Sequence, residues 1–587
     1  MLTGFARGVL LLTSALTSAA AAAQQVPPAE TQRPSLPSRE QIERTEQPDA
    51  QPDSTVRIDS RGAIAPMPCA LETSPLRVTL TSVTFQDPSG NPLHPDLLRL
   101  LAPIGTGPAG EQPIAVVCTI RDQVNAALSD AGYVALAQIP GQQIESGNLT
   151  ITIVSARIVE VRVLGDLGPY RRLLESRIEA LRSLDPLNRR DAERILLLTG
   201  DVPGVDVRLA LRAAGQGARP GDVIGELSVE TQRAQVLANV QNFGSRQLGE
   251  WIASVRGEMY GITGLADRTF LAYSNSIDWE EIRVLQGGHD FALTDGGLRA
   301  GLRGSLAWSR PDILNLDLRS RSSIATFELS QQLARSLAVQ VKVGGGLELL
   351  DQQTRIHQSG TAIPFTRDRL RVGFLRLDGE SRFFAPTGEV SGLLAGYAEI
   401  RKGLDIFDAS EQGVSRGGFS PSRFEGNPQA FVARAELIGE VRPSRYFTIA
   451  GQAFGQWAND PLLNLEEFSL GNFTYGRGYD PGSNGGDRAY AFRLEPRLRL
   501  PIDLPLNVEL TGFYDDVHLR NLDAGTTERS RRLRSVGGGV RLIKSGLFVV
   551  DALYAHPLDR VLTTDDVKPR DRFLVSLTAQ LYPWRSR

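Results

Sequence analysis

Hydrophobic and polar positions follow two different periods along the chain, and the change falls near residue 232. Before it, apolar side chains recur at the three- and four-residue spacing of amphipathic helices, between short alternating stretches. After it the helical period disappears, and many short stretches alternate residue by residue, as strands do when their two faces meet different surroundings. The pattern predicts an α+β N-terminal part followed by an all-β C-terminal part.

Residues 72–231 repeat one order of elements twice. The first copy predicts a strand over 77–85, whose alternation slips near Ser82, helices around 94–101 and 119–133, and strands at 133–139 and 148–154. The second copy predicts a strand at 158–165, a helix with Leu174, Ile178 and Leu181 on one face, a helix from Asn188 to Gly200, and strands at 205–211 and 223–230. We therefore expect two small tandem α+β domains, over residues 69–155 and 156–231.

The C-terminal part, residues 232–587, predicts a barrel. In LRAGLRGSLAWS (298–309), Leu302 and Trp308 lie on one face and Arg303 on the other, and RFLVSLTAQL (572–581) alternates in the same way. A soluble sandwich also alternates, but rarely over roughly 355 residues as one domain. A transmembrane barrel satisfies every backbone group without an edge and tolerates a polar interior. At roughly 22 residues for each strand and its connection, about 16 antiparallel strands are expected.

The N-terminus predicts export. Residues 1–23 begin with one positive charge at Arg7, continue with an apolar stretch and end in small residues, the order of a secretory signal peptide. Residues 24–68 contain eight prolines and few apolar residues, which favours an extended or disordered leader. Within this leader, residues 38–47 favour a short helix with Ser38 as N-cap and Gln41 closing a capping box. So short a helix is marginal unless it binds a surface.

Composition narrows the function classes. Charged residues make up 22% of the chain and the net charge is −3, so there is no electrostatic footprint of nucleic-acid binding. The two cysteines, Cys69 and Cys118, are either two buried thiols or a disulfide. A disulfide there would close a loop of roughly 50 residues. By lowering the entropy of the unfolded chain, it would add about 4 kcal/mol to the free energy of unfolding. Two cysteines alone are too few for a metal site.

Enzyme chemistry finds little support. The five histidines are scattered without metal-binding spacing. Residues 413–417 fit G-x-S-x-G, but their flanks read as loop, whereas a nucleophile elbow needs a strand before it and a helix after it. We expect no catalytic residue, no metal and no cofactor.

A glycine-rich stretch, FTYGRGYDPGSNGGDRAY (473–490), surrounds Arg477. It lacks the G-x-x-x-x-G-K-[ST] spacing of a phosphate loop. An arginine on such a loop can fold back into a water-filled lumen and bind a carboxylate in bidentate geometry. The other interpretation, an external loop with a solvated arginine, stays open on these residues alone.

Three longer stretches carry a resemblance to a known family. GYVALAQIPGQQIESGNLTITIVSARI (132–158), LNRRDAERILLLTGDVPGVDV (187–207) and NVQNFGSRQLG (239–249) are similar to outer-membrane transporters of two-partner secretion, the hemolysin activation and secretion (TpsB-type) family of the Omp85 superfamily. The resemblance implies two α+β POTRA domains in the periplasm, at 69–155 and 156–231. It also implies an outer-membrane β-barrel over 232–587.

The resemblance implies a substrate-gating loop at about 470–492, locked to the barrel wall. The family's R-G-[YF] and F-x-D motifs are met by Arg477, Gly478, Tyr479, Phe513 and Asp515. Asp516 offers a second carboxylate, and Val517 stands where the family often has glycine. The resemblance therefore leaves open which of the two aspartates receives the arginine.

Two further features are implied by the resemblance. Cys69 and Cys118 fall near the paired cysteines of many members' first POTRA domain, which favours the disulfide. The helix at 38–47 lies where the family places a plug helix threaded through the barrel.

The implied function is a pore that recognises an unfolded exported protein through its POTRA domains and secretes it to the cell surface or medium, without nucleotide hydrolysis. The partner expected is a large β-helical protein of adhesin or cytolysin type. Outer-membrane lipid and, during biogenesis, the barrel assembly machinery are further partners of a monomeric chain. The alternatives are an Omp85-type factor that inserts other outer-membrane proteins, and a passive porin or receptor.

Overall fold

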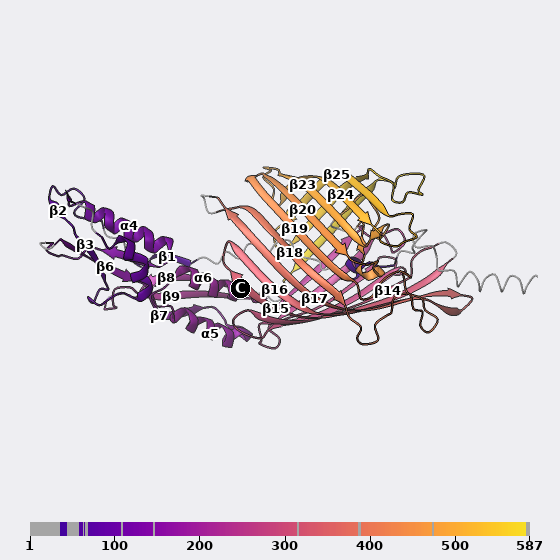
Figure 1. Ribbon diagram of the computed structural model, residues 1–587, viewed down its shortest axis with the longest axis horizontal. Coiled ribbons are helices and arrows are strands. Elements are labelled where there is room, and N and C mark those ends of the chain that lie inside the picture. The colour runs from indigo at the N-terminus through magenta and orange to yellow at the C-terminus, as the bar shows by residue number, and fades with distance from the viewer. Residues whose placement is uncertain are drawn as a thin grey trace, which may run out of the picture.

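The computed structural model describes residues 36–43, 58–62, 64, 68–106, 110–144, 147–215, 217–313, 316–385, 389–471 and 475–582. The predicted signal peptide, residues 1–23, lies outside them. Figure 1 shows an α+β part at one end of a tilted-strand barrel. Within the described residues, no helix has both the length and the apolar character needed to cross a membrane.

The first α+β domain holds a three-stranded sheet, a two-stranded sheet and two main helices. Its elements are β2 (Arg77–Thr79), β3 (Ser82–Gln86), α3 (Pro95–Leu101), η1 (Ala102–Ile104), β4 (Glu111–Pro113), α4 (Val116–Asp130), β5 (Ala135–Gln138) and β6 (Asn148–Ser155). Strand β6 pairs with β3 in parallel and with β5 antiparallel. The prediction of a single strand over 77–85 is wrong. The strand is interrupted between Thr79 and Ser82, where the alternation slips, and its first part, β2, pairs with β4 rather than joining the sheet of β3. A disulfide joins Cys69 to Cys118 in α4, with 6.0 Å between their Cα atoms.

The second α+β domain has a four-stranded sheet covered by two helices. Its elements are β7 (Arg157–Leu164), η2 (Gly168–Tyr170), α5 (Arg171–Arg182), α6 (Arg189–Gly200), β8 (Val205–Ala213) and β9 (Asp222–Thr231). Asn188 caps α6 by accepting a 2.9 Å hydrogen bond from the Arg190 amide.

The edge strand of this second sheet comes from the leader. The sheet order is β1-β8-β9-β7, and β1 (Ile58–Gly62) pairs in parallel with β8. This segment of the leader is extended, and it is ordered because it pairs with the sheet of the second domain. Pairing with an open sheet edge uses main-chain groups, so the polar sequence IDSRG needs no alternating pattern to form a strand.

Sixteen antiparallel strands close into the barrel, as the sequence predicted, with β10 hydrogen-bonded to β27. They are β10 (Ala234–Gln241), β11 (Ile252–Tyr260), β12 (Arg268–Ser276), β13 (Ile282–Ala292), β14 (Leu298–Ser309), β15 (Asp317–Arg335), β16 (Val339–Gln358), β17 (Thr361–Phe384), β18 (Val390–Gly403), β19 (Phe431–Ser444), β20 (Phe447–Ala458), β23 (Arg488–Arg499), β24 (Asn507–Arg520), β25 (Ser530–Lys544), β26 (Phe548–Pro557) and β27 (Arg572–Leu581).

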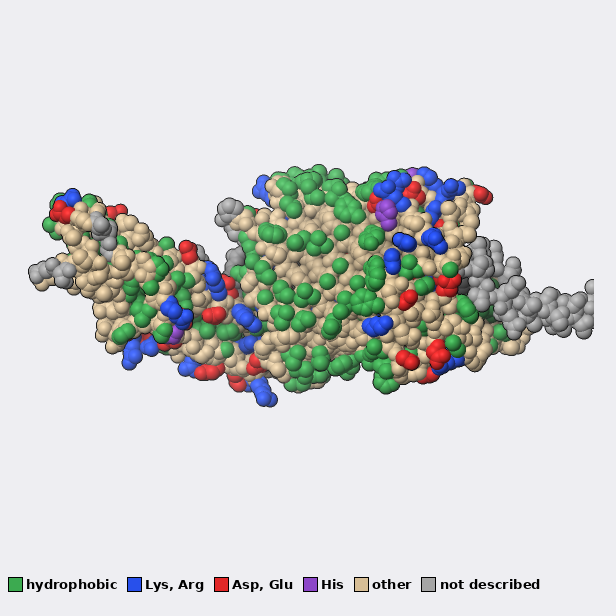
Figure 2. All heavy atoms as spheres, viewed as in Figure 1, with side chains coloured by type: hydrophobic (Ala, Val, Ile, Leu, Met, Phe, Trp, Pro, Cys, Tyr) green, Lys and Arg blue, Asp and Glu red, His purple; other side chains and the backbone are tan. Residues whose placement is uncertain are grey.

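The two faces of the barrel wall differ in chemistry. On β14, Leu302 and Trp308 are 55% and 40% exposed on the outer face, whereas Ser305 is buried. Figure 2 shows hydrophobic side chains spread over the visible barrel wall, with charged side chains gathered toward the end away from the α+β domains. This division suits a wall that meets lipid outside and polar groups inside.

The second α+β domain is packed onto the barrel rim. Tyr170 of η2 shares one hydrophobic core with Tyr260 and Ala266 of the barrel. Arg335, at the end of β15, donates two hydrogen bonds of 2.7 and 2.8 Å to Asp201. Because β10 leaves this rim, the connection after β20, the eleventh strand, opens at the opposite end.

Candidate functional site

The loop between β20 and β23, residues 459–487, turns back into the lumen. It holds η3 (Asn464–Glu466), β21 (Phe468–Ser469) and β22 (Gly485–Gly486). The predicted loop, about 470–492, is displaced: the loop starts earlier, and residues 488–492 belong to the wall strand β23. Its tip is buried in the barrel, where Tyr475 and Tyr479 pack with Val517 and Leu519 of β24.

Arg477 at this tip meets the wall through a dense set of contacts. Its guanidinium donates to both carboxylate oxygens of Asp515, at 3.0 and 3.2 Å, and its backbone amide donates to the same side chain at 3.0 Å. A further guanidinium nitrogen donates to Glu495 at 2.7 Å. The guanidinium carbon lies 3.6 Å from the centre of the Phe513 ring. Charge, hydrogen bonds and a cation–π contact therefore all fix one arginine.

Arg477 pairs with Asp515 rather than with Asp516. Phe513, Asp515 and Val517 are buried on the lumen side of β24, because alternate residues of a strand share a face. Asp516 lies on the other face and accepts hydrogen bonds of 2.7 and 3.1 Å from Arg532. Asp515 is fully buried, and Arg493 donates to it as well, at 3.2 Å.

Gly478 and Tyr479 fit the tip against the neighbouring strands. A Cβ atom on Gly478 would lie 2.7 Å from Cβ of Ser535 on β25, so the close approach requires glycine. The Tyr479 hydroxyl donates to the Arg534 carbonyl at 2.7 Å and accepts from the Asp559 amide at 3.1 Å. Each residue of the motif thus has its own role: Arg477 forms the ion pair, Gly478 allows the close approach to β25, and Tyr479 hydrogen-bonds to the backbone beside it.

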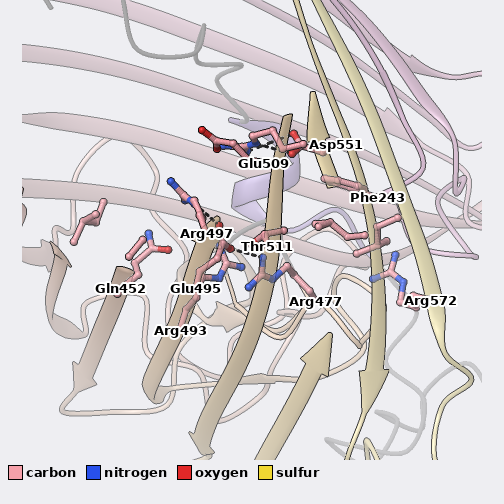
Figure 3. A pocket seen from close by; sticks show the side chains of 17 residues that line it. Phe243, Gln452, Arg477, Arg493, Glu495, Arg497, Glu509, Thr511, Asp551 and Arg572 are labelled. Atoms are coloured by element: carbon pink, nitrogen blue, oxygen red, sulfur yellow. Dashed lines mark hydrogen bonds and ion pairs between the residues drawn. The ribbon is translucent and has the colours of Figure 1, made fainter. Parts of the chain in front are cut away.

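A cavity of about 230 Å³ lies next to this lock. Figure 3 shows Arg477, Arg493, Glu495 and Arg497 close together at its wall, with Glu509 and Asp551 further along. Side chains of both signs line the space, as expected for a hydrated lumen. Among the residues that the structure describes, no group of His, Cys, Asp and Glu is arranged to hold a metal ion.

A second buried arginine cluster holds the N-terminal segment inside the barrel. The helix α2 (Arg39–Ile42) begins with the expected capping box of Ser38 and Gln41. It ends at Ile42, so the predicted helix over 38–47 is shorter in the described part, and residues 44–47 lie outside it. Ile42 is fully buried among apolar side chains of β13 to β17, and its carbonyl accepts a 2.6 Å hydrogen bond from Gln286.

This second cluster joins α2, the loop and the wall. Arg39 donates to Glu348 of β16 at 2.6 Å and to Glu466 of η3 at 3.4 Å. Arg401 of β18, whose side chain is 2% exposed, donates to the same two carboxylates at 2.5 and 2.7 Å. Burial would raise the pKa of Glu466, but the guanidiniums around it, Arg401 foremost, hold that pKa below its ordinary value.

Sequence reasoning missed most of this second cluster. It singled out the α2 segment but not Glu348, Arg401 or Glu466. Arg39 and Glu466 are 427 positions apart in the chain, and no local spacing marks a pair of that kind. Only the closed barrel brings them together.

The fold is a closed barrel that carries an α+β part at one rim and holds a loop and a short helix in its lumen. The family model described as haemolysin secretion/activation protein ShlB/FhaC/HecB matches residues 310–542. The chain is 21% identical over 565 residues to the heme/hemopexin transporter protein HuxB of Haemophilus influenzae strain 86-028NP, covering 90% of this chain and 92% of that one.

Solved structures agree in fold. CdiB from Escherichia coli has a TM-score of 0.68 at 18% identity, covering 89% of this chain and 94% of that chain. CdiB from Acinetobacter baumannii has a TM-score of 0.60 at 15% identity, with coverages of 92% and 95%. The chain is therefore similar to haemolysin secretion/activation proteins over residues 310–542 and to a transporter protein over nearly its whole length, and its fold is like that of CdiB.

Proposed function

We propose that this chain is an outer-membrane transporter of two-partner secretion that exports one unfolded partner protein through the space that α2 fills, while the tip of loop 459–487 stays attached to the opposite wall. The observation that supports this proposal is the separation of the loop tip from the seat of α2, which the loop contacts only near its beginning, at η3. Helix α2 seats against β13 to β17, whereas Arg477 and Tyr479 are fixed on β23 to β25. Withdrawal of α2 opens one side of the lumen without breaking the Arg477–Asp515 pair.

The α2 segment is suited to leave, and the loop tip is suited to stay. Within the described residues, α2 is a single helical turn, which has little stability of its own. Arg477 makes a bidentate pair and further contacts with fully buried groups, and losing one partner of such a pair costs about 3–5 kcal/mol. In this scheme, residues 38–47 are the plug, and Arg477 with Asp515 keeps the lumen in its conducting form.

Recognition of the partner falls to the POTRA-type domains in the periplasm. The second sheet offers main-chain groups at the outer edge of β7, where an extended chain can add a strand. The second domain, packed on the barrel rim, would deliver that chain to the lumen. Folding of an adhesin- or cytolysin-type β-helix outside the cell supplies direction, so nucleotide hydrolysis has no role.

Purified barrel in liposomes, given a urea-unfolded partner and no nucleotide, tests this function. We expect the partner to reach the protease-protected side, and an arrested partner fused to a folded domain to crosslink to lumen residues such as Gln452. The partner for this test is sought among large exported proteins encoded beside this chain. Insertion of other barrels into the liposomes, without any partner in the lumen, would instead indicate an assembly factor.

A further inference from the structure

Arg423, in the loop 404–430, is buried in a third cluster outside both sites described above. Its side chain is 4% exposed and faces three carboxylates, on Glu467, Asp487 and Asp523. It donates to Glu467 and Asp487 at 2.5 Å each, donates again to Asp487 at 3.2 Å, and bonds Asp523. Three different loops, 404–430, 459–487 and 521–529, thus meet on one guanidinium.

Asp487 closes the neck of the gating loop. It is the last residue before β23, and it accepts a 2.7 Å hydrogen bond from the amide of Leu462, near the loop's beginning. Its other oxygen accepts from the Leu522 amide, also at 2.7 Å. Arg423 adds a bond to the Leu462 carbonyl at 2.9 Å. Both ends of the loop are therefore held together through Arg423 and Asp487.

Close packing and hydrogen bonds keep the two loops in contact beside this cluster. A Cβ atom on Gly426 would lie 2.8 Å from Cδ2 of Leu463 and 3.2 Å from the Leu462 carbonyl oxygen, so a side chain there would have to displace the Leu463 side chain. The Asn427 side chain donates to Asp460 at 3.0 Å, and its amide donates to the Pro461 carbonyl at 2.8 Å. The loop 404–430 is thus the support on which the neck of the gating loop rests.

We propose that Arg423 is a positioning residue for Arg477. By clamping the neck of loop 459–487, it holds the loop tip within reach of Asp515. Loss of Arg423 leaves three buried carboxylates without their shared cation, which is strongly unfavourable. The neck then opens and the tip leaves the wall, although no contact of Arg477 itself has been changed. The inference rests on the proposed function only where it treats the tip as part of the gate.

Chemical crosslinking between the loop tip and the wall measures this directly. Asp480, next to the tip, lies 3.7 Å from Arg246 of the β10–β11 connection, and both side chains are partly exposed, so cysteines at these two positions can be joined by a short bismaleimide. The native cysteines are already joined to each other. We expect Arg423→Lys, which keeps the charge but loses the planar fork, to slow crosslinking of the R246C/D480C pair at least about fivefold, and Arg423→Ala to slow it further.

Arg416→Lys is the matched control, because Arg416 lies in the same loop but is half exposed and pairs with the exposed Asp408 and Glu411. Folding is checked by heat-modifiable migration, and Arg423→Leu with Glu467→Gln and Asp523→Asn serves if Arg423→Ala does not fold. Crosslinking at the parent rate in folded Arg423 variants would overturn the inference. Slower crosslinking with normal export would uphold it and count against the gating role of the tip instead.

Discussion

The two buried arginine clusters in the lumen share their chemistry but differ in what they hold. Arg477 attaches the tip of loop 459–487 to the wall. Both ends of this loop continue into wall strands, β20 and β23. Arg401 helps to seat a short N-terminal turn through carboxylates that Arg39 also contacts. Similar ion pairs therefore serve a permanent attachment in one place and a removable one in the other. What distinguishes them is the connection of the segment rather than the strength of any single pair.

The largest effect is expected from breaking the attachment at Arg477. Arg477→Ala leaves Asp515 and Glu495 buried without their main cation, a loss of about 3–5 kcal/mol. We predict that export falls at least about a hundredfold while barrel levels in the outer membrane stay normal, as measured by partner in the medium and by immunoblot.

Exchanging the charges of Arg477 and Asp515 tests whether export depends on the contact between them. Arg477→Asp with Asp515→Arg should recover part of the export lost in either single variant, since recovery requires that the two side chains touch. Export at the parent level in Arg477→Ala would remove the role assigned to the loop tip.

A smaller and opposite effect is expected at α2. Arg39→Ala takes one of the cations from Glu348 and Glu466 but leaves Arg401 in place. If the variant weakens the binding of α2 in the lumen by about 1.4 kcal/mol, the equilibrium between plugged and open barrel shifts toward the open form about tenfold. Recording in planar bilayers should therefore show a longer total open time. Glu40→Ala, at an exposed position of the same turn, is the control and should conduct like the parent. Equal conductance in all three proteins would contradict the plug assignment.

The smallest effect is expected at Asp516. This side chain points away from the lumen and pairs with Arg532 near the surface, and such exposed pairs contribute about 0–1 kcal/mol. Asp516→Asn should export within about twofold of the parent. A loss comparable to that of Asp515→Asn would mean that the two aspartates are not distinguished by the face of β24 they occupy.

Much of the fold could be predicted from the sequence, because the spacing of apolar residues that marks strands and helices is contained within short stretches of the chain. Alternation over 298–309 and 572–581 indicated barrel strands, and Asn188 and Ser38 indicated helix starts that the structure contains. The leader strand β1 was beyond prediction, because its pairing with β8 uses backbone groups rather than a side-chain pattern.

The site, too, could be predicted only where its residues lie in short motifs. Arg477 and Asp515 were found through short motifs, and the choice between Asp515 and Asp516 needed the register of β24. Arg401, Glu348 and Arg423 carry no motif, since the pairs Arg423–Glu467, Arg401–Glu348 and Arg423–Asp523 are 44, 53 and 100 positions apart in the chain. Such pairs become visible only after the strands close.

Export from two crosslinked barrels tests the central claim most directly. One carries cysteines at Ile42 and Ala307, which lie in the same buried cluster, so that joining them fixes α2 to the wall. The other carries cysteines at Arg246 and Asp480, whose side chains are 3.7 Å apart, so that joining them fixes the loop tip. Secretion is measured before and after crosslinking, with the uncrosslinked variants and the parent as references. We predict that fixing α2 abolishes export and that fixing the loop tip leaves it within about twofold of the parent. Export through a barrel with α2 fixed, or its arrest by fixing the tip, would contradict the account.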